Sequence, residues 1–208
     1  MTDLSKNQNY RSTPVIYLVS GHTKASPGGV FGGRTEADDC SRLCLALENE
    51  LKGLDSGLHI KVLEGSCLQQ EMNEDDLLFV FHEGTSCKSS PKKGAAIFVK
   101  ENADVKIQYE AFSLLSTVCS KYGFRYNGVH PEGSRSPFKS LQRALPERTF
   151  FIVSGYIESS TDNLNFDSML SYSLPLAGEI LKIYKERKNE DNTTVYKASF
   201  GGEQIKAS

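Results

Sequence analysis

The stretch PVIYLVSGHTKASPGGVFGGRTEADD, residues 14–39, contains in succession the patterns of a strand, a loop and a helix. Pro14–Ser20 is a short apolar run rich in β-branched residues, which is typical of a strand buried on both faces. A glycine-rich loop follows over 21–33. Acidic residues then crowd a predicted first helical turn at Thr35–Asp39, where the helix dipole favours negative charge. The order predicts a strand that leads through a loop into a helix.

The rest of the chain continues this alternation. Apolar residues spaced three or four apart predict helices over 35–52, 105–122 and 168–188. Short apolar runs predict strands over 58–63, 77–82, 94–99 and 149–154. Residues 124–143 read as a loop, with a short helix over 138–145. Alternating strands and helices imply crossover connections, so we expect a single α/β domain whose mostly parallel, twisted sheet is flanked by helices on both faces.

Composition bounds the kind of protein. The chain has 208 residues, and its 38% hydrophobic and 24% charged content is ordinary for a folded domain. Its 24 Lys and Arg residues nearly balance 26 Asp and Glu residues, which argues against a dedicated nucleic-acid binder. No apolar run approaches the ~18 residues of a membrane helix. We expect a domain over 14–188 between a flexible N-terminal tail, 1–13, and a C-terminal tail or small hairpin, 189–208.

Three side chains fall where sheets of this kind bind ligands, beyond the carboxyl ends of the strands. His22 follows the first predicted strand, His82 ends the run LLFVFH, and Glu36 begins the helix after the loop. Two neutral imidazoles and one carboxylate are typical of a catalytic zinc site, with the fourth coordination position left open. Each residue alone is more often a cap or a surface group, so it is their convergence on one sheet edge that favours a metal site.

The order of these motifs resembles the zinc-dependent N-acetylmuramoyl-L-alanine amidases, a family of cell-wall hydrolases that also occurs in phage endolysins. That family has a strand ending in Gly-His, a Glu at the start of the next helix and a later strand ending in His. Further segments of this chain resemble the family at Gly94–Phe98, Gly128-Val129 and Leu176–Ile180, so the resemblance covers roughly 14–184. It implies that His22, Glu36 and His82 bind Zn²⁺. It also implies cleavage of the amide between N-acetylmuramic acid and L-alanine in peptidoglycan.

The last predicted strand departs from the family pattern. The family carries a proton-transferring Glu two residues before a Gly-Phe pair on this strand. Matching Gly155-Tyr156 to that pair places Val153 at the position of the Glu. General acid–base catalysis contributes ~10²–10⁴-fold to rates, so the ordinary mechanism should be impaired unless another group substitutes.

Three carboxylates are candidates for that substitute. Glu158 lies in the loop just past the strand and is the tentative substitute base; an exposed loop carboxylate is the alternative interpretation. Glu83 follows His82, and strand alternation aims it away from the His82 face if the strand continues. Glu147 precedes the last strand, at its opposite end.

The sequence leaves three functional interpretations open. The first is a zinc amidase with altered or weak activity. The second is a domain that lost the reaction and binds peptidoglycan fragments or a protein partner. The third is a zinc hydrolase for another amide or ester.

His130, Arg135 and Lys139 are interpreted as surface residues, with substrate contact as the alternative. Residues 1–13 lack the apolar stretch of a signal peptide, so we expect a protein cytoplasmic as synthesised, whose release to the cell wall would need a non-signal route.

Overall fold

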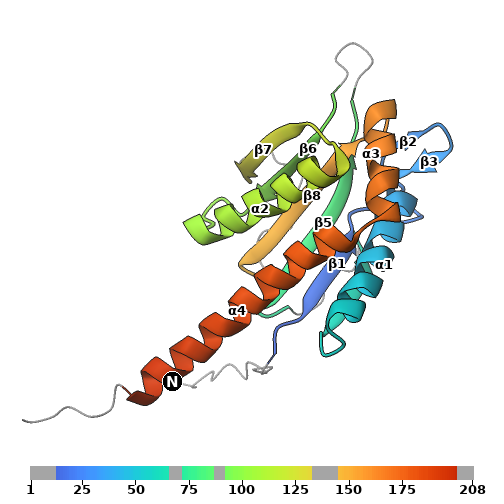
Figure 1. The fold of residues 1–208 in the computed structure, drawn as a ribbon. Helices are drawn as coiled ribbons and strands as arrows, with labels where there is room; N and C mark the ends of the chain where they lie inside the picture. Colours follow the sequence, from blue (N-terminus) through green and yellow to red (C-terminus); the bar gives the residue numbers. More distant parts are fainter. Residues whose placement is uncertain (1–12, 66–71, 87–91, 133–144, 201–208) are drawn as a thin grey trace, which may run out of the picture.

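Six strands form one sheet in the order β4-β1-β5-β8-β6-β7 (Figure 1). The structure is a computed structural model that describes residues 13–65, 72–86, 92–132 and 145–200. The strands are β1 (Ile16–Ser20), β4 (Ile60–Glu64), β5 (Leu77–Gly84), β6 (Ala95–Val99), β7 (Tyr126–Pro131) and β8 (Arg148–Tyr156). Every neighbouring pair is parallel except β6 and β8, which are antiparallel. The prediction of a mostly parallel sheet in an α/β domain is confirmed.

Four helices pack against one face of this sheet (Figure 1). They are α1 (Glu36–Leu54), α2 (Val105–Tyr122), α3 (Ser160–Ser171) and α4 (Leu174–Phe200). Helix α4 lies between α1 and α2 and contacts both. The larger core is buried between these helices and the sheet, where the rings of Phe79 and Phe150 stack with centroids 5.2 Å apart. No described helix combines the length and the apolarity needed to span a bilayer.

The other face of the sheet carries a smaller apolar cluster. Its buried residues are Val15, Tyr17, Val19, Leu78, Val80, Leu145 and Phe151. The short helix expected over 138–145 falls almost entirely on 133–144, outside the described residues. Helices on this second face therefore stay a prediction.

The glycine-rich loop contains a short hairpin that the sequence analysis did not predict. Strand β2 (Val30–Phe31) pairs antiparallel with β3 (Arg34–Thr35). The two residues between them, Gly32 and Gly33, have φ angles of 58° and 82°. A two-residue type I′ turn requires positive φ at both positions, and glycine adopts it without strain. The hairpin ends directly at the start of α1.

The C-terminal part differs from expectation at three places. Strand β7 forms inside the predicted loop 124–143. Among the described strands it pairs with β6 alone, and an edge strand does not need an apolar run. The single helix expected over 168–188 is replaced by α3 and α4, because the backbone leaves the helical conformation at Tyr172, with φ −143° and ψ 68°. Helix α4 continues to Phe200 in place of a hairpin, while 201–208 and the tail 1–12 lie outside the described residues.

Candidate metal centre

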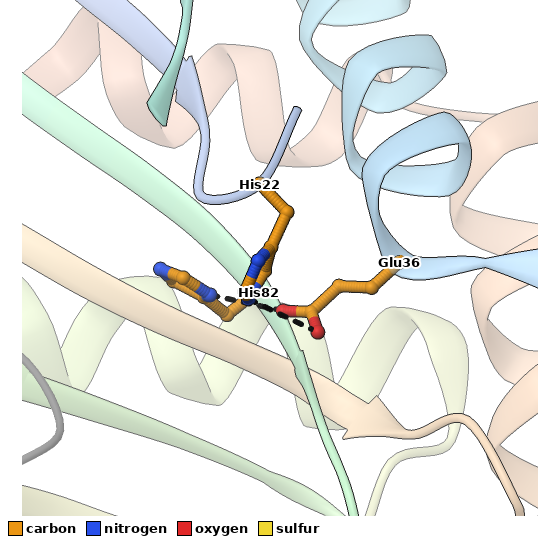
Figure 2. Close-up of side chains that lie close together, drawn as sticks. All are labelled: His22, Glu36 and His82. Atoms are coloured by element: carbon orange, nitrogen blue, oxygen red, sulfur yellow. Dashed lines mark hydrogen bonds and ion pairs between the residues drawn. The ribbon is translucent and has the colours of Figure 1, made fainter. Parts of the chain in front are cut away.

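The three predicted ligands meet at one edge of the sheet (Figure 2). Strands β1 and β5 are parallel neighbours, so His22, just past β1, comes close to His82 near the end of β5. Glu36 is the first residue of α1. One ligand atom from each side chain lies within 4.8 Å of the other two. The imidazole rings stand edge to face, with centroids 5.2 Å apart and an interplanar angle of 88°.

Glu36 is 2% exposed, and both of its carboxylate oxygens are engaged. Oε1 lies 2.9 Å from His82 Nδ1 and accepts the Glu83 backbone N–H at 3.0 Å. Oε2 accepts the Gly29 backbone N–H at 3.1 Å and lies 3.4 Å from His22 Nε2. Burial alone raises the pKa of Glu36. The hydrogen bonds from His82 and Gly29, with the attraction of both imidazoles when these are protonated, outweigh burial and lower that pKa below its ordinary value. Glu36 is therefore held as an anion.

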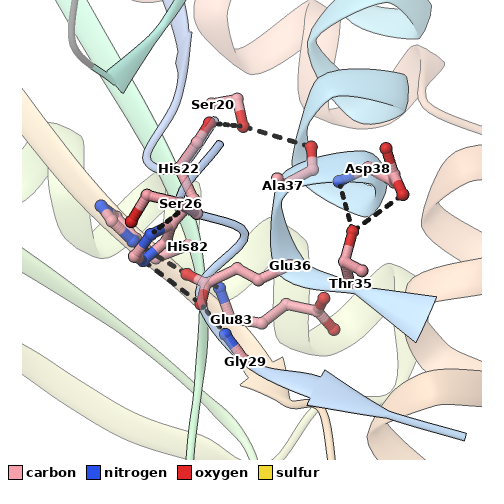
Figure 3. Close-up of polar contacts among 10 residues, drawn as sticks. All are labelled: Ser20, His22, Ser26, Gly29, Thr35, Glu36, Ala37, Asp38, His82 and Glu83. Atoms are coloured by element: carbon pink, nitrogen blue, oxygen red, sulfur yellow. Dashed lines mark hydrogen bonds and ion pairs between the residues drawn. The ribbon is translucent and has the colours of Figure 1, made fainter. Parts of the chain in front are cut away.

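The loop and the helix start put these groups in place (Figure 3). Thr35 caps α1 by accepting the Asp38 backbone N–H at 3.1 Å, so Glu36 enters the first helical turn. Ser20 is 1% exposed, and its hydroxyl donates to the His22 carbonyl at 3.1 Å. Gly28 has φ 72°, and a Cβ there would come within 2.7 Å of the His22 ring. The loop can close over the site only because this position is glycine.

The hydrogen bond made by His22 defines which of its nitrogens faces Glu36. His22 Nδ1 lies 3.2 Å from the carbonyl oxygen of Ser26, which can only accept, so this nitrogen carries the hydrogen. The neutral ring then presents the Nε2 lone pair to Glu36 Oε2, and two acceptors repel each other unless a proton or a metal cation lies between them. Their 3.4 Å separation is close to the ~3.4 Å between two ligand atoms on a tetrahedral zinc with ~2.1 Å bonds. Metal-binding histidines commonly make this second hydrogen bond to a carbonyl. The donor set therefore fits a divalent metal.

Val153 lies beside His82 in the sheet. The two residues are register partners in β8 and β5, and partners in adjacent strands point to the same face. The position matched to the family Glu is thus next to a proposed metal ligand, with a side chain that has no proton to exchange. On the other side of β8, the register partner of Val153 in strand β6 is Ala96, which also carries no ionisable group.

Glu83 faces the helix side of the sheet. Strand β5 continues through Gly84, so alternation points Glu83 away from the face that His82 occupies, as the sequence analysis predicted for a continuing strand. Its side chain is buried near Asp39 and Arg34. Burial, together with the negative charge of Asp39, raises the pKa of Glu83 to about 9 against the opposing effect of Arg34. Only the backbone N–H of Glu83 reaches the metal site.

The remaining candidates lie elsewhere. The carboxylate of Glu158 accepts the Ser86 backbone N–H at 3.1 Å, which ties the loop after β8 to the loop after β5. Glu147 directly precedes β8, at the opposite end of the strand from Val153. His130 is exposed, with its ring 5.4 Å from that of Phe98. Arg135 and Lys139 lie outside the described residues.

The fold is that of the N-acetylmuramoyl-L-alanine amidases. An amidase from Clostridium difficile 630 matches with a TM-score of 0.61 and 14% identity, over 83% of this chain and 97% of that one. AmiC2 of Nostoc punctiforme matches with a TM-score of 0.62 and 14% identity, over 84% and 98%. The catalytic domain of CwlV from Bacillus (Paenibacillus) polymyxa matches with a TM-score of 0.63 and 13% identity, over 83% and 99%. No protein-family model and no curated protein sequence matches the chain. At these identities the likeness shows the fold alone.

Proposed function

We propose that this protein is a zinc-dependent hydrolase that cleaves the amide between N-acetylmuramic acid and L-alanine in peptidoglycan. One observation carries the proposal: two imidazoles and a buried carboxylate converge within 4.8 Å at the strand ends of a domain with the amidase fold. His22, Glu36 and His82 would hold the ion, and three protein ligands leave one coordination position open for a substrate.

The residues of the chain have distinct roles in this proposal. Bound zinc supplies a Lewis acid that polarises a carbonyl and acidifies water. Glu36 is a ligand and not a base, because backbone N–H groups and the imidazoles already occupy both of its oxygens. Glu158 is the proposed substitute proton carrier, and to act it must release the backbone N–H of Ser86.

Val153 favours a second candidate function, a domain that kept the fold and lost the reaction. Such a domain would bind peptidoglycan fragments or a protein partner. A protein with this fold, the CwlD amidase of Clostridioides difficile, has been solved in complex with the GerS lipoprotein; it matches with a TM-score of 0.56 and 13% identity, over 88% of this chain and 100% of that one. The two candidates share the metal site and differ in whether an amide bond is cleaved.

Metal analysis tests the site itself. We expect the untagged protein to contain about one zinc per chain by plasma mass spectrometry, and His22→Ala to lose it. His59→Ala is the matched control, because His59 is exposed and directly precedes β4, away from the three ligands. Protein that takes up no zinc after incubation with the ion and desalting would contradict the proposal.

An activity assay separates the two candidates. Purified peptidoglycan is incubated with zinc-loaded protein, and new L-alanine amino termini are quantified by mass spectrometry. We expect slow release that falls at least ~10²-fold in Glu158→Gln, the loss typical of a missing general base. Zinc-loaded protein that binds peptidoglycan fragments without releasing amino termini would support the second candidate, a domain that kept the fold and lost the reaction.

A further inference from the structure

A cluster of charged side chains lies directly behind the metal ligands, on the helix side of the sheet. We call Arg34, Asp39 and Glu83 the acid–arginine cluster. Asp39 is 3% exposed and Glu83 is 4% exposed. Arg34 Nε donates to Asp39 Oδ2 at 2.8 Å, and the carboxyl group of Glu83 is buried close to the charged groups of Asp39 and Arg34. Arg34 Nη1 also donates to Asp167 Oδ1 at 2.9 Å.

This cluster joins the elements that carry the proposed ligands. Asp39 belongs to the first turns of α1, which Glu36 begins. Glu83 belongs to β5 and directly follows His82. Asp167 belongs to α3, so Arg34 ties the start of α1 to a further helix. The cluster therefore fixes the start of α1 relative to the end of β5, the spacing on which the ligand geometry depends.

The link to the ligands runs through the backbone of Glu83. Its N–H donates to Glu36 Oε1 at 3.0 Å, and the same oxygen lies 2.9 Å from His82 Nδ1 (Figure 3). The side chain of Glu83 is buried close to Asp39 and Arg34 on the helix side of the sheet, while its backbone N–H donates to Glu36. A shift of Glu83 would therefore move both Glu36 and His82.

We propose that Arg34, Asp39 and Glu83 are positioning residues that set the geometry and the affinity of the metal site through the Glu83 backbone. This inference rests on the proposed metal site. An apolar residue at position 83 would avoid the cost of burying a carboxyl group, so filling the core does not explain Glu83. The groups that orient metal ligands typically change metal affinity by ~10–100-fold when they are removed.

The test is a zinc titration against a chelator of known affinity. We expect Glu83→Ala and Asp39→Ala to weaken zinc binding by ~10–100-fold. Glu83→Gln should stay within a few-fold of the wild type, because a glutamine has the same size and its amide N–H can donate to Asp39. Asp167→Ala removes the contact of Arg34 with α3 and leaves the contact with Asp39. Because Asp167 is half-exposed, this variant should fold, and its zinc binding should be several-fold weaker.

Glu110→Ala is the matched control for lost stability. Glu110 is 3% exposed and pairs with Arg148 at the opposite end of β8, so its loss should destabilise the fold and leave zinc affinity unchanged. The absorption spectrum of the Co²⁺-loaded protein should change in Glu83→Ala and not in Glu110→Ala. Wild-type affinity and spectrum in Glu83→Ala, Asp39→Ala and Asp167→Ala would overturn this inference alone. A wild type that binds no zinc would overturn the proposed function as well.

Discussion

At the scale of single residues, the hydrogen bonds of a few atoms set the geometry of the candidate metal centre. The Ser26 carbonyl fixes the hydrogen of His22 on Nδ1, which leaves Nε2 facing Glu36. Backbone N–H groups of Gly29 and Glu83 hold one carboxylate oxygen each, so Glu36 cannot rotate away. The side chains are thus arranged before any ion binds, which lowers the cost of binding one.

Val153 provides the sharpest test at this scale. Val153→Glu places a carboxylate beside His82, where register partners share a face of the sheet. We expect the release of L-alanine amino termini from peptidoglycan to rise by ~10²–10⁴-fold, with the zinc content unchanged. Val153→Gln is the control, because it matches the size of Glu and cannot transfer the proton. Equal rates in the two variants would contradict the assigned role of this position.

At the scale of elements, helix α1 connects the core to the site. Its apolar side chains Leu43, Leu47 and Leu51 are fully buried in the larger core, and its first residue is Glu36. The N-terminus of a helix favours a negative charge, which supports the anionic form of Glu36. The packing that stabilises the fold therefore also orients a ligand.

The cap of α1 should contribute to stability. Thr35→Ala removes the acceptor for the Asp38 backbone N–H and should lower the free energy of unfolding by about 1 kcal/mol. Thr35→Ser keeps a capping hydroxyl and should recover most of the loss. Urea denaturation curves measure both variants, and an unchanged midpoint for Thr35→Ala would count against this cap.

The buried face of α1 should matter more than its exposed face. Leu47 is 0% exposed and Leu45 is 49% exposed. Leu47→Ala leaves a cavity in the core and should cost about 2–5 kcal/mol of unfolding free energy. Leu45→Ala should stay within about 0.5 kcal/mol of the wild type in the same denaturation experiment. Similar losses in both variants would show that α1 packs differently.

At the scale of the whole molecule, the proposed metal site joins segments that are distant in sequence. His22, Glu36 and His82 come from the ends of two strands and the start of a helix. An ion held by all three would bind the folded chain and not the unfolded one. Metal binding should therefore stabilise the entire domain.

A thermal melt measures this coupling. Zinc at 100 times its Kd should add about 2.7 kcal/mol to the free energy of unfolding. For a chain of this size, that corresponds to a rise in Tm of roughly 5–11 °C. A chelator should reverse the rise, and His82→Ala should show none. Identical melting temperatures of the wild type with zinc and with chelator would refute the coupling.

The local pattern of residues was sufficient for the elements that are buried. The runs that became β1 and β5 are apolar because helices or other side chains cover both of their faces, and the spacing over 105–122 predicted the observed bounds of α2. The sequence analysis missed strand β7 and helix α3. An edge strand and a polar, capped helix bury too few side chains to require a regular spacing of apolar residues in the sequence.

The sequence by itself determined the fold class and predicted three side chains that the fold brings together, since both follow from where apolar runs end and which side chains come next. Only the tertiary structure decided that Val153 is in register with His82 and that Glu83 turns to the helix side, toward Asp39. It also decided which nitrogen of His22 faces Glu36. The physical reason is that register, burial and hydrogen-bond partners depend on segments that are distant along the chain and meet only when it folds.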